Sequence, residues 1–135
     1  MRVLLWPECS PGEEGPLFEA LVASGRSGTL PAAILVAQAE DGTLIGFLEA
    51  GMRSHADGCD TAHPVGYVEG WFVREGFRGQ GIGAALMRAA EHWARAHGCR
   101  EIASDVLIDN PASEAAHRTL GFEVVDRCVH LRKGL

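Results

Sequence analysis

Four glycines within eight residues, Gly76 to Gly83, constrain the fold of this chain more than any other feature. Residues 65–74, just before them, are rich in β-branched and aromatic residues and predict a strand. After the glycines the pattern changes to helical spacing, and Gly98 is well placed to end the helix in a left-handed conformation. The apolar face predicted for this helix comprises Ile82, Ala85, Leu86, Ala89, Trp93 and Ala96. The sequence thus predicts a strand, a glycine turn and an amphipathic helix in succession.

Such a turn is suited to an anion. The first N–H groups of a helix lack intrahelical partners and carry a partial positive charge, and glycine lets a bulky phosphate approach the backbone. No Lys follows Gly83, which argues against a nucleoside triphosphatase, and Ala84 breaks the dinucleotide-binding fingerprint. On the glycines alone, a phosphate or pyrophosphate site and a merely structural connection both remain open.

The other segments place this unit in a mixed sheet. Residues 17–25 predict a short helix, and residues 31–39 and 43–53 predict a hairpin of two strands around a tight turn. Residues 99–107 predict a strand, residues 111–120 a helix closed by Gly121, and residues 122–132 one or two final strands. We expect an α/β (α+β) fold with a mixed central sheet flanked by helices, in a single domain spanning residues 1–135.

The formal net charge of −6 argues against a nucleic-acid partner and mildly favours a cationic small molecule. The sequence contains neither a stretch apolar enough to span a membrane nor a secretory signal, so we expect a cytoplasmic protein without a membrane partner. Its four cysteines are widely spaced and have no histidines at metal-ligand intervals, so no metal site is expected.

Two motifs together are more specific than the glycines alone. Arg78, Gly81 and Gly83 after the aromatic strand, followed by Asn110, Ser113, His117, Gly121 and Phe122, resemble the GCN5-related N-acetyltransferase (GNAT) superfamily. The segments LLWP, GCD, VEGWFV, GCREIASD and LGFEVVDR look most like the bacterial aminoglycoside 6'-N-acetyltransferases. Against that pattern the chain is expected to lack the usual first strand and part of the first helix, which would expose a sheet edge.

The resemblance implies a GNAT fold and acetyl-CoA as cosubstrate. It implies that backbone groups of the glycine turn bind the pyrophosphate, that residues 71–73 pair through their main chain with the pantetheine arm, and that Asn110 contacts the cofactor besides capping a helix. The cofactor-binding residues implied in this way are Trp71, Phe72, Val73, Gly79, Gln80, Gly81, Ile82, Gly83, Ala84 and Asn110.

For the acceptor, the resemblance implies transfer of an acetyl group to the 6'-amino group of aminoglycosides by direct attack in a ternary complex, giving resistance. Glu69 and Asp105 are the candidate catalytic residues, and the candidate substrate residues are Trp6, Glu69, Asp105 and Asp126. Glu69 and Asp105 are expected near the middle of strands, where a carboxylate is costly to bury. His117 stands where relatives carry an acid for the departing thiolate, and its role is left open, as is that of His55.

Two alternatives to aminoglycoside acetylation remain. One is acetylation of another polycation, such as a polyamine or a protein lysine, because an acidic pocket suits these acceptors too. The other is a catalytically idle acyl-CoA-binding module. The resemblance further implies a homodimer, with a shared or swapped C-terminal strand as one arrangement.

Overall fold

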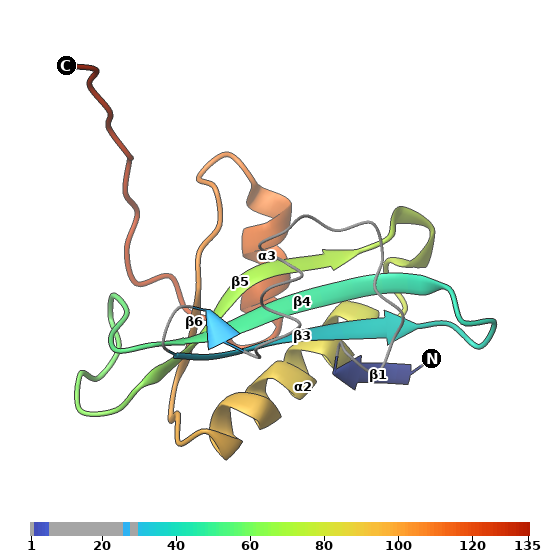
Figure 1. Ribbon diagram of the computed structural model, residues 1–135. Coiled ribbons are helices and arrows are strands. Elements are labelled where there is room, and N and C mark those ends of the chain that lie inside the picture. Colours follow the sequence, from blue (N-terminus) through green and yellow to red (C-terminus); the bar gives the residue numbers. More distant parts are fainter. Residues whose placement is uncertain (1, 6–25, 28–29) are drawn as a thin grey trace.

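A computed structural model describes residues 2–5, 26–27 and 30–135. Its strands lie in the order β1-β3-β4-β5-β6, and β2 pairs with one end of β3 (Figure 1). All neighbours are antiparallel except β5 and β6, which are parallel. This is the mixed, mostly antiparallel sheet predicted from the sequence. The strands are β1 (Arg2–Leu5), β2 (Arg26–Ser27), β3 (Leu30–Gln38), β4 (Leu44–Arg53), β5 (Val65–Val73) and β6 (Ile102–Ser104).

The predicted hairpin is confirmed as β3 and β4. Its turn contains Gly42, whose φ of +89° belongs to the left-handed region that glycine adopts readily. The carboxylate of Asp41 accepts a hydrogen bond from the backbone N–H of Thr43 at 2.9 Å, which stabilises the turn. At the outer edge of β3, residues 2–5 form β1, a strand that the sequence patterns did not predict.

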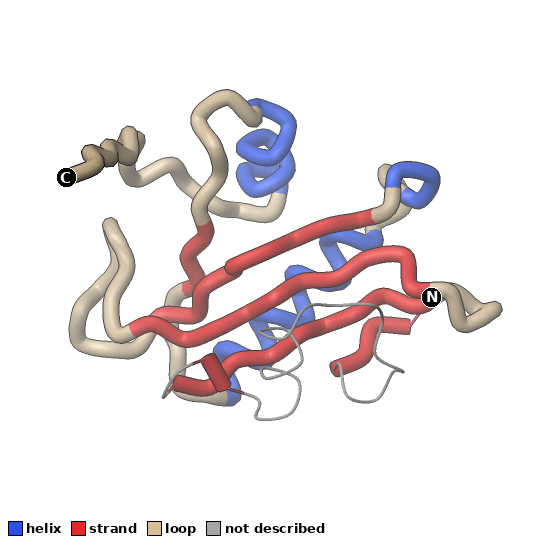
Figure 2. Tube along the Cα trace, turned by 45° about the horizontal axis from the view of Figure 1, so that its top comes forward, coloured by secondary structure: helices blue, strands red, loops and turns tan. Residues whose placement is uncertain are grey.

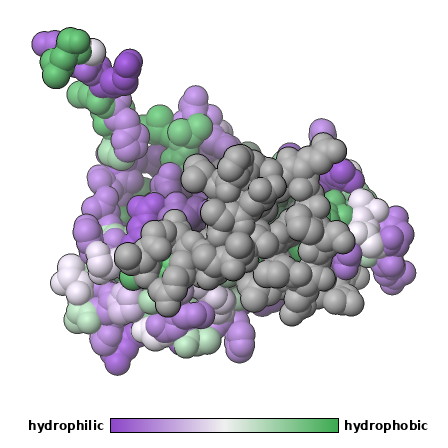
Figure 3. Space-filling model, viewed as in Figure 1, coloured by the Kyte–Doolittle hydropathy of each residue, from purple (hydrophilic) through white to green (hydrophobic). Residues whose placement is uncertain are grey.

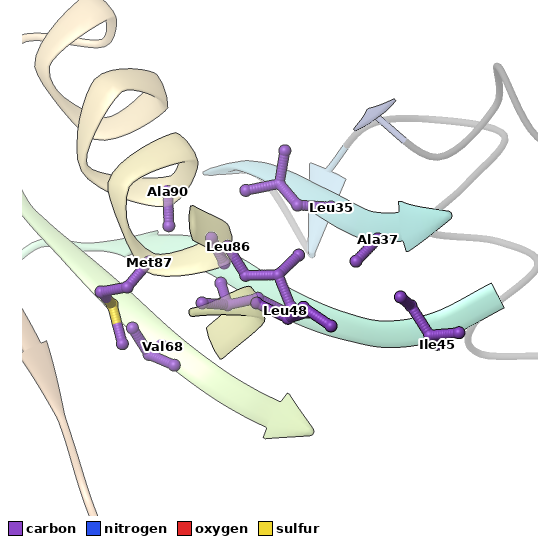
Figure 4. Close-up of a cluster of buried hydrophobic side chains, with 10 residues drawn as sticks. Leu35, Ala37, Ile45, Leu48, Val68, Leu86, Met87 and Ala90 are labelled. Carbon is purple, nitrogen blue, oxygen red and sulfur yellow. The ribbon is translucent and has the colours of Figure 1, made fainter. Parts of the chain in front are cut away.

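The helix after the glycine turn is α2 (Ile82–Ala96), and Figure 1 shows it crossing the sheet. It packs on the strand face that carries Leu48 and Val68, and Leu86 and Met87 are almost completely buried there (Figure 4). Met87, Ala90 and Ala94 are buried, while Ala96 is exposed. The buried face of α2 is therefore rotated about the helix axis from the predicted face toward residues 87, 90 and 94. Gly98 ends the helix at φ +84°, as predicted.

The short 3-10 helix η1 (Glu75–Phe77) joins β5 to the glycine turn, and α3 (Pro111–Thr119) confirms the second predicted helix. Of the strand predicted over residues 99–107, only the three residues of β6 are observed. This strand pairs only with Gly66–Val68, because a bulge at Glu69 bends β5 away from it beyond that point. Figure 2 shows β6 meeting β5 only near the start of β5.

The strands predicted over residues 122–132 are wrong. From Phe122 onward no residue belongs to a strand, and the segment runs away from the sheet (Figure 1). A strand needs hydrogen-bonding partners along a neighbouring edge, and residues 122–132 pair with none of the described strands. The helix predicted over residues 17–25 lies outside the described residues.

Candidate active site

The glycine turn has the backbone shape that an anion site needs. Gly79 and Gly81 adopt φ angles of +78° and +80°, and Gly81 is the N-cap of α2. A Cβ built at either glycine would meet nothing within 4 Å, so the space beside both is open. The N–H groups at the start of α2 have no partner within the helix and carry its positive dipole. Open space and free amides together fit a bulky anion.

Arg78 and Trp71 fix this turn against β5. The Nε–H of Arg78 donates to the carbonyl oxygen of Val73 at 2.9 Å, and the Nε1–H of Trp71 donates to the carbonyl oxygen of Gly83 at 3.2 Å. A Cβ on Gly83 would lie 3.1 Å from the indole Cζ2 atom, so Gly83 allows Trp71 to pack closely against the first turn of α2. The start of α2 is thereby held at the end of β5.

The second half of β5 has an unpaired edge. Arg74 donates its backbone N–H to the oxygen of Ile45 at 2.8 Å, which makes positions 45 and 74 a hydrogen-bonded pair. Hydrogen-bonded and non-hydrogen-bonded pairs alternate along an antiparallel ladder. The main-chain groups of Phe72 therefore point toward β4, whereas those of Trp71 and Val73 point to the opposite side. Because β6 pairs no further than Val68, this side has no strand partner among the described residues. We call residues 69–73 the open edge of β5.

A network of four side chains links the two predicted catalytic carboxylates. Arg53 donates to both carboxylate oxygens of Glu69 at 3.0 Å, and its guanidinium carbon lies 3.4 Å from the centre of the Tyr67 ring. The Tyr67 hydroxyl donates to Asp105 at 2.7 Å. Burial, followed by this hydrogen bond to Asp105, raises the pKa of Tyr67 to about 12. We call Glu69, Arg53, Tyr67 and Asp105 the carboxylate network.

The positions of the two carboxylates differ in part from those predicted. Glu69 is the extra residue of the bulge, since Glu49 pairs with Gly70 and Ala50 with Val68, and its side chain is 37% exposed. Asp105 follows the end of β6 and is also exposed. Glu69 thus lies in the middle of a strand, β5, as predicted, but without the expected burial, because the bulge turns its side chain outward. For Asp105 the expectation is wrong in both respects, because β6 ends at Ser104.

Three polar residues near this site were missed. Glu49, Arg53 and Tyr67 lie in the segments predicted as strands 43–53 and 65–74. Glu49 and Arg53 alternate with Leu48 and Ala50, which pack under α2, so they lie on the opposite face. Partial burial, and then the negative charge of Glu69, raise the pKa of Glu49 above its usual value. Polar residues at alternate positions of an otherwise apolar strand were the sequence signal available.

The second motif caps α3 and buries one of its residues, His117. The side chain of Asn110 accepts the N–H of Ser113 at 3.1 Å and caps α3, as its sequence position predicts. His117 is 7% exposed, with its Nδ1 atom 2.7 Å from the Ser113 carbonyl oxygen and its Nε2 atom 2.9 Å from the Ser104 hydroxyl. Because a carbonyl only accepts, Nδ1 carries the hydrogen, and in the neutral ring Nε2 accepts from Ser104. The ring also packs edge-on against Trp71 and Phe122.

The remaining predicted residues lie apart from the network or outside the described region. Asp126 is exposed on the C-terminal segment and accepts the backbone N–H of Arg127 at 2.8 Å. His55 is exposed beside Ser54, whose hydroxyl lies 3.1 Å from its Nδ1 atom. Trp6 lies outside the described residues. Within residues 2–5, 26–27 and 30–135, no group of three or more His, Cys, Asp or Glu side chains is placed to hold a metal ion.

The glycine turn at the start of α2 and the open edge of β5 are the two features through which the GNAT resemblance implies binding of acetyl-CoA. The chain belongs to the Acetyltransferase (GNAT) family, whose family model matches residues 1–122. It is 42% identical to the aminoglycoside N(6')-acetyltransferase type 1 of Klebsiella aerogenes, over all of this chain and 87% of the relative. The resemblance seen in the sequence motifs is thus confirmed.

Two solved structures agree. AAC(6')-Iy in complex with the bisubstrate analogue CoA-S-monomethyl-acetylneamine superposes with a TM-score of 0.81 at 31% identity, covering 99% of this chain and 98% of the other. AAC(6')-Iy in complex with CoA superposes with a TM-score of 0.75 at 36% identity, covering 87% and 83%. In the described part of our chain, no helix is both long and apolar enough to cross a membrane.

Proposed function

We propose that this chain is a single-domain, acetyl-CoA-dependent N-acetyltransferase that acetylates the 6'-amino group of aminoglycosides. The observation that carries the proposal is the junction of the open edge of β5 with the free amides at the start of α2, beside the carboxylate network. The relatives that match the whole chain bear the name of this activity. A cytoplasmic location is part of the same proposal.

The residues present fit the cosubstrate. The amides of Gly79 to Ala84 bind its pyrophosphate at the start of α2, where the dipole favours negative charge and both left-handed glycines leave space. The main-chain groups of Trp71 and the N–H of Val73 point outward and pair with the pantetheine arm as an added strand would, while the Val73 carbonyl accepts from Arg78 and Phe72 offers its exposed ring. Asn110 lies at the start of α3 and contacts the same arm.

The bound thioester supplies the acyl group and a good leaving group. An outward N–H of the open edge polarises its carbonyl oxygen, and the acceptor amine is held against the carbonyl carbon. The neutral amine forms a new C–N bond, the C–S bond breaks with its electron pair going to sulfur so that CoA leaves as the thiolate, and the proton lost from the nitrogen passes to Glu69 or Asp105, directly or through water. His117 holds α3 against Trp71, and both of its ring nitrogens are occupied, so we assign it no proton transfer.

The same carboxylates bind the cationic acceptor. Glu69 and Asp105 provide negative charge near the open edge, and we propose that Asp126 and Trp6 contact more distant parts of the aminoglycoside. Acidic groups of this kind suit polyamines and lysine side chains as well, so the acceptor has to be established by assay.

The experiment is a comparison of acceptors. The protein is incubated with acetyl-CoA and either kanamycin, tobramycin, spermidine or a lysine peptide, and the release of free thiol is followed. We expect the aminoglycosides to be preferred, with mass spectrometry placing the acetyl group on the 6'-nitrogen. Faster turnover of spermidine or the peptide would change the acceptor class, and tight acetyl-CoA binding without any thiol release would indicate an idle module.

We also propose a homodimer formed through the C-terminal segment. Val125, Val129 and Leu131 are 63%, 74% and 92% exposed, and their odd-numbered positions put them on one face of an extended segment. Figure 3 shows apolar groups on this segment where it projects from the body. The start of the segment is held by an ion pair of 2.6 Å between Arg127 and Glu114 and by the packing of Val125 against Gly58. Sedimentation analysis should give a dimer, and Val129→Asp should shift it to a monomer; a monomeric parent protein would refute the dimer.

A further inference from the structure

Arg53 lies at the last position of β4, on the sheet face away from α2. Its guanidinium forms three hydrogen bonds to Glu69, two of 3.0 Å and one of 3.2 Å, and covers the face of Tyr67. A carboxylate on one side and an aromatic face on another are the surroundings that a bound ammonium group prefers. In the free protein, therefore, the Arg53 guanidinium occupies a place that would suit an ammonium group of a bound ligand.

No other described side chain competes for this place. The remaining ion pairs among residues 2–5, 26–27 and 30–135 join Arg95 to Glu91 on α2 and Arg127 to Glu114 near α3. The network holds two carboxylates, Glu69 and Asp105, and the single guanidinium of Arg53 cannot neutralise both. A guest that carries several ammonium groups can replace Arg53 at Glu69 and still find the second carboxylate free of a cation.

The pair can also be opened at small cost. The side chains of Arg53 and Glu69 are 46% and 37% exposed, and ion pairs with this exposure are worth about two- to fivefold in an equilibrium constant. The Arg53 side chain has solvent on its outer side into which it can turn. Displacement by a polycation is therefore within reach, whereas a weakly charged amine gains too little from the exchange.

We propose that Arg53 is a specificity-determining residue: its guanidinium occupies the ammonium subsite in front of Glu69 and swings aside when a polycationic acceptor binds. This inference rests on the proposed function in one respect, namely that the acceptor is a polycationic amine. It makes the acceptor compete with an internal cation, so the site favours acceptors with several positive charges over amines with one.

The first test measures the affinity of the complex of the protein with CoA for kanamycin by calorimetry. Arg53→Met keeps the aliphatic packing on Tyr67 and removes the charge, and it should bind kanamycin about two- to fivefold more tightly than the parent protein. Arg53→Lys, which keeps the charge without the planar fork, should fall between the two. Arg95→Met is the matched control, since it removes one exposed arginine from a surface ion pair on α2 and should leave the affinity unchanged.

The second measurement follows the Arg53 Nε–H by NMR. Its hydrogen bond to Glu69 should protect it from exchange in the free protein and in the CoA complex, and kanamycin should remove that protection. Equal or weaker binding by Arg53→Met, or protection that persists with kanamycin bound, would overturn the proposal.

Failure of the proposed function can be told apart from failure of this inference. If the parent protein does not acetylate kanamycin, the proposed function fails, and the same two measurements with spermidine decide on Arg53. Binding of neither cation overturns this inference as well.

Discussion

Replacing Gly81 with Ala strains the glycine turn without creating a clash. Gly81 has φ +80° and ψ 6°, a left-handed conformation that costs an L-residue about 1–2 kcal/mol. The smaller conformational freedom of unfolded Ala offsets about 0.4–1 kcal/mol, so the central values leave a net loss of about 0.8 kcal/mol. The unfolding entropy of a 135-residue chain is about 0.28 kcal/mol/K, so the Tm should fall by about 3 °C.

The same variant should bind CoA about tenfold more weakly, because relaxing the strain turns the amides at the start of α2 away from the pyrophosphate. Calorimetric melting and CoA titration measure both effects. Gly76→Ala is the matched control: it lies in η1, its φ is not positive, and a Cβ there would also meet nothing within 4 Å. Equal melting temperatures and equal CoA affinities for the two variants would show that the left-handed backbone at Gly81 does not shape the site.

Three further predictions concern the carboxylates and their neighbours. Glu69→Gln should lower kcat/KM for kanamycin about tenfold or more while CoA affinity stays the same, and unchanged kinetics would remove Glu69 from the mechanism. The pKa of Glu49 is raised above 4.5 in the folded state, so its stabilising contribution is present below pH 4.5 and is lost as the pH rises through the folded pKa. Glu49→Gln should therefore melt higher than the parent at pH 7 and equally below pH 4.5, and a lower Tm at pH 7 would contradict this sign. Tyr67 is the one tyrosine of the sequence, so tyrosinate absorbance reports it alone; with a pKa of about 12 it should stay almost entirely neutral at pH 10.5, and half ionisation near pH 10 would refute the buried bond to Asp105.

Much of the fold follows from local patterns. The hairpin of β3 and β4, the boundaries of α2 and the capped start of α3 were predictable because glycine turns and capping residues act on the nearest few residues. The C-terminal segment was not. Its alternating apolar residues satisfy the pattern of a strand, but a strand also requires a neighbouring edge, which no local pattern supplies.

The parts of the site that consist of backbone groups were predictable from the sequence. Left-handed Gly81 and the cap at Asn110 follow from residue type and position. The bulge at Glu69 and its ion pair with Arg53 do not, because they depend on how β4 and β5 align, and these two residues are 16 positions apart. Burial of His117 between Trp71 and Phe122 likewise depends on how α3 packs against the sheet.

The central claim is that the amides opening α2, together with the open edge of β5, bind CoA. It is tested most directly by titrating the isotope-labelled protein with CoA and following every backbone amide by NMR. The largest shifts should fall on residues 79–84 and on Trp71 and Val73, with little change at Gly98 on the far end of the helix. Saturable binding that shifts other amides and leaves residues 79–84 unchanged would contradict the account.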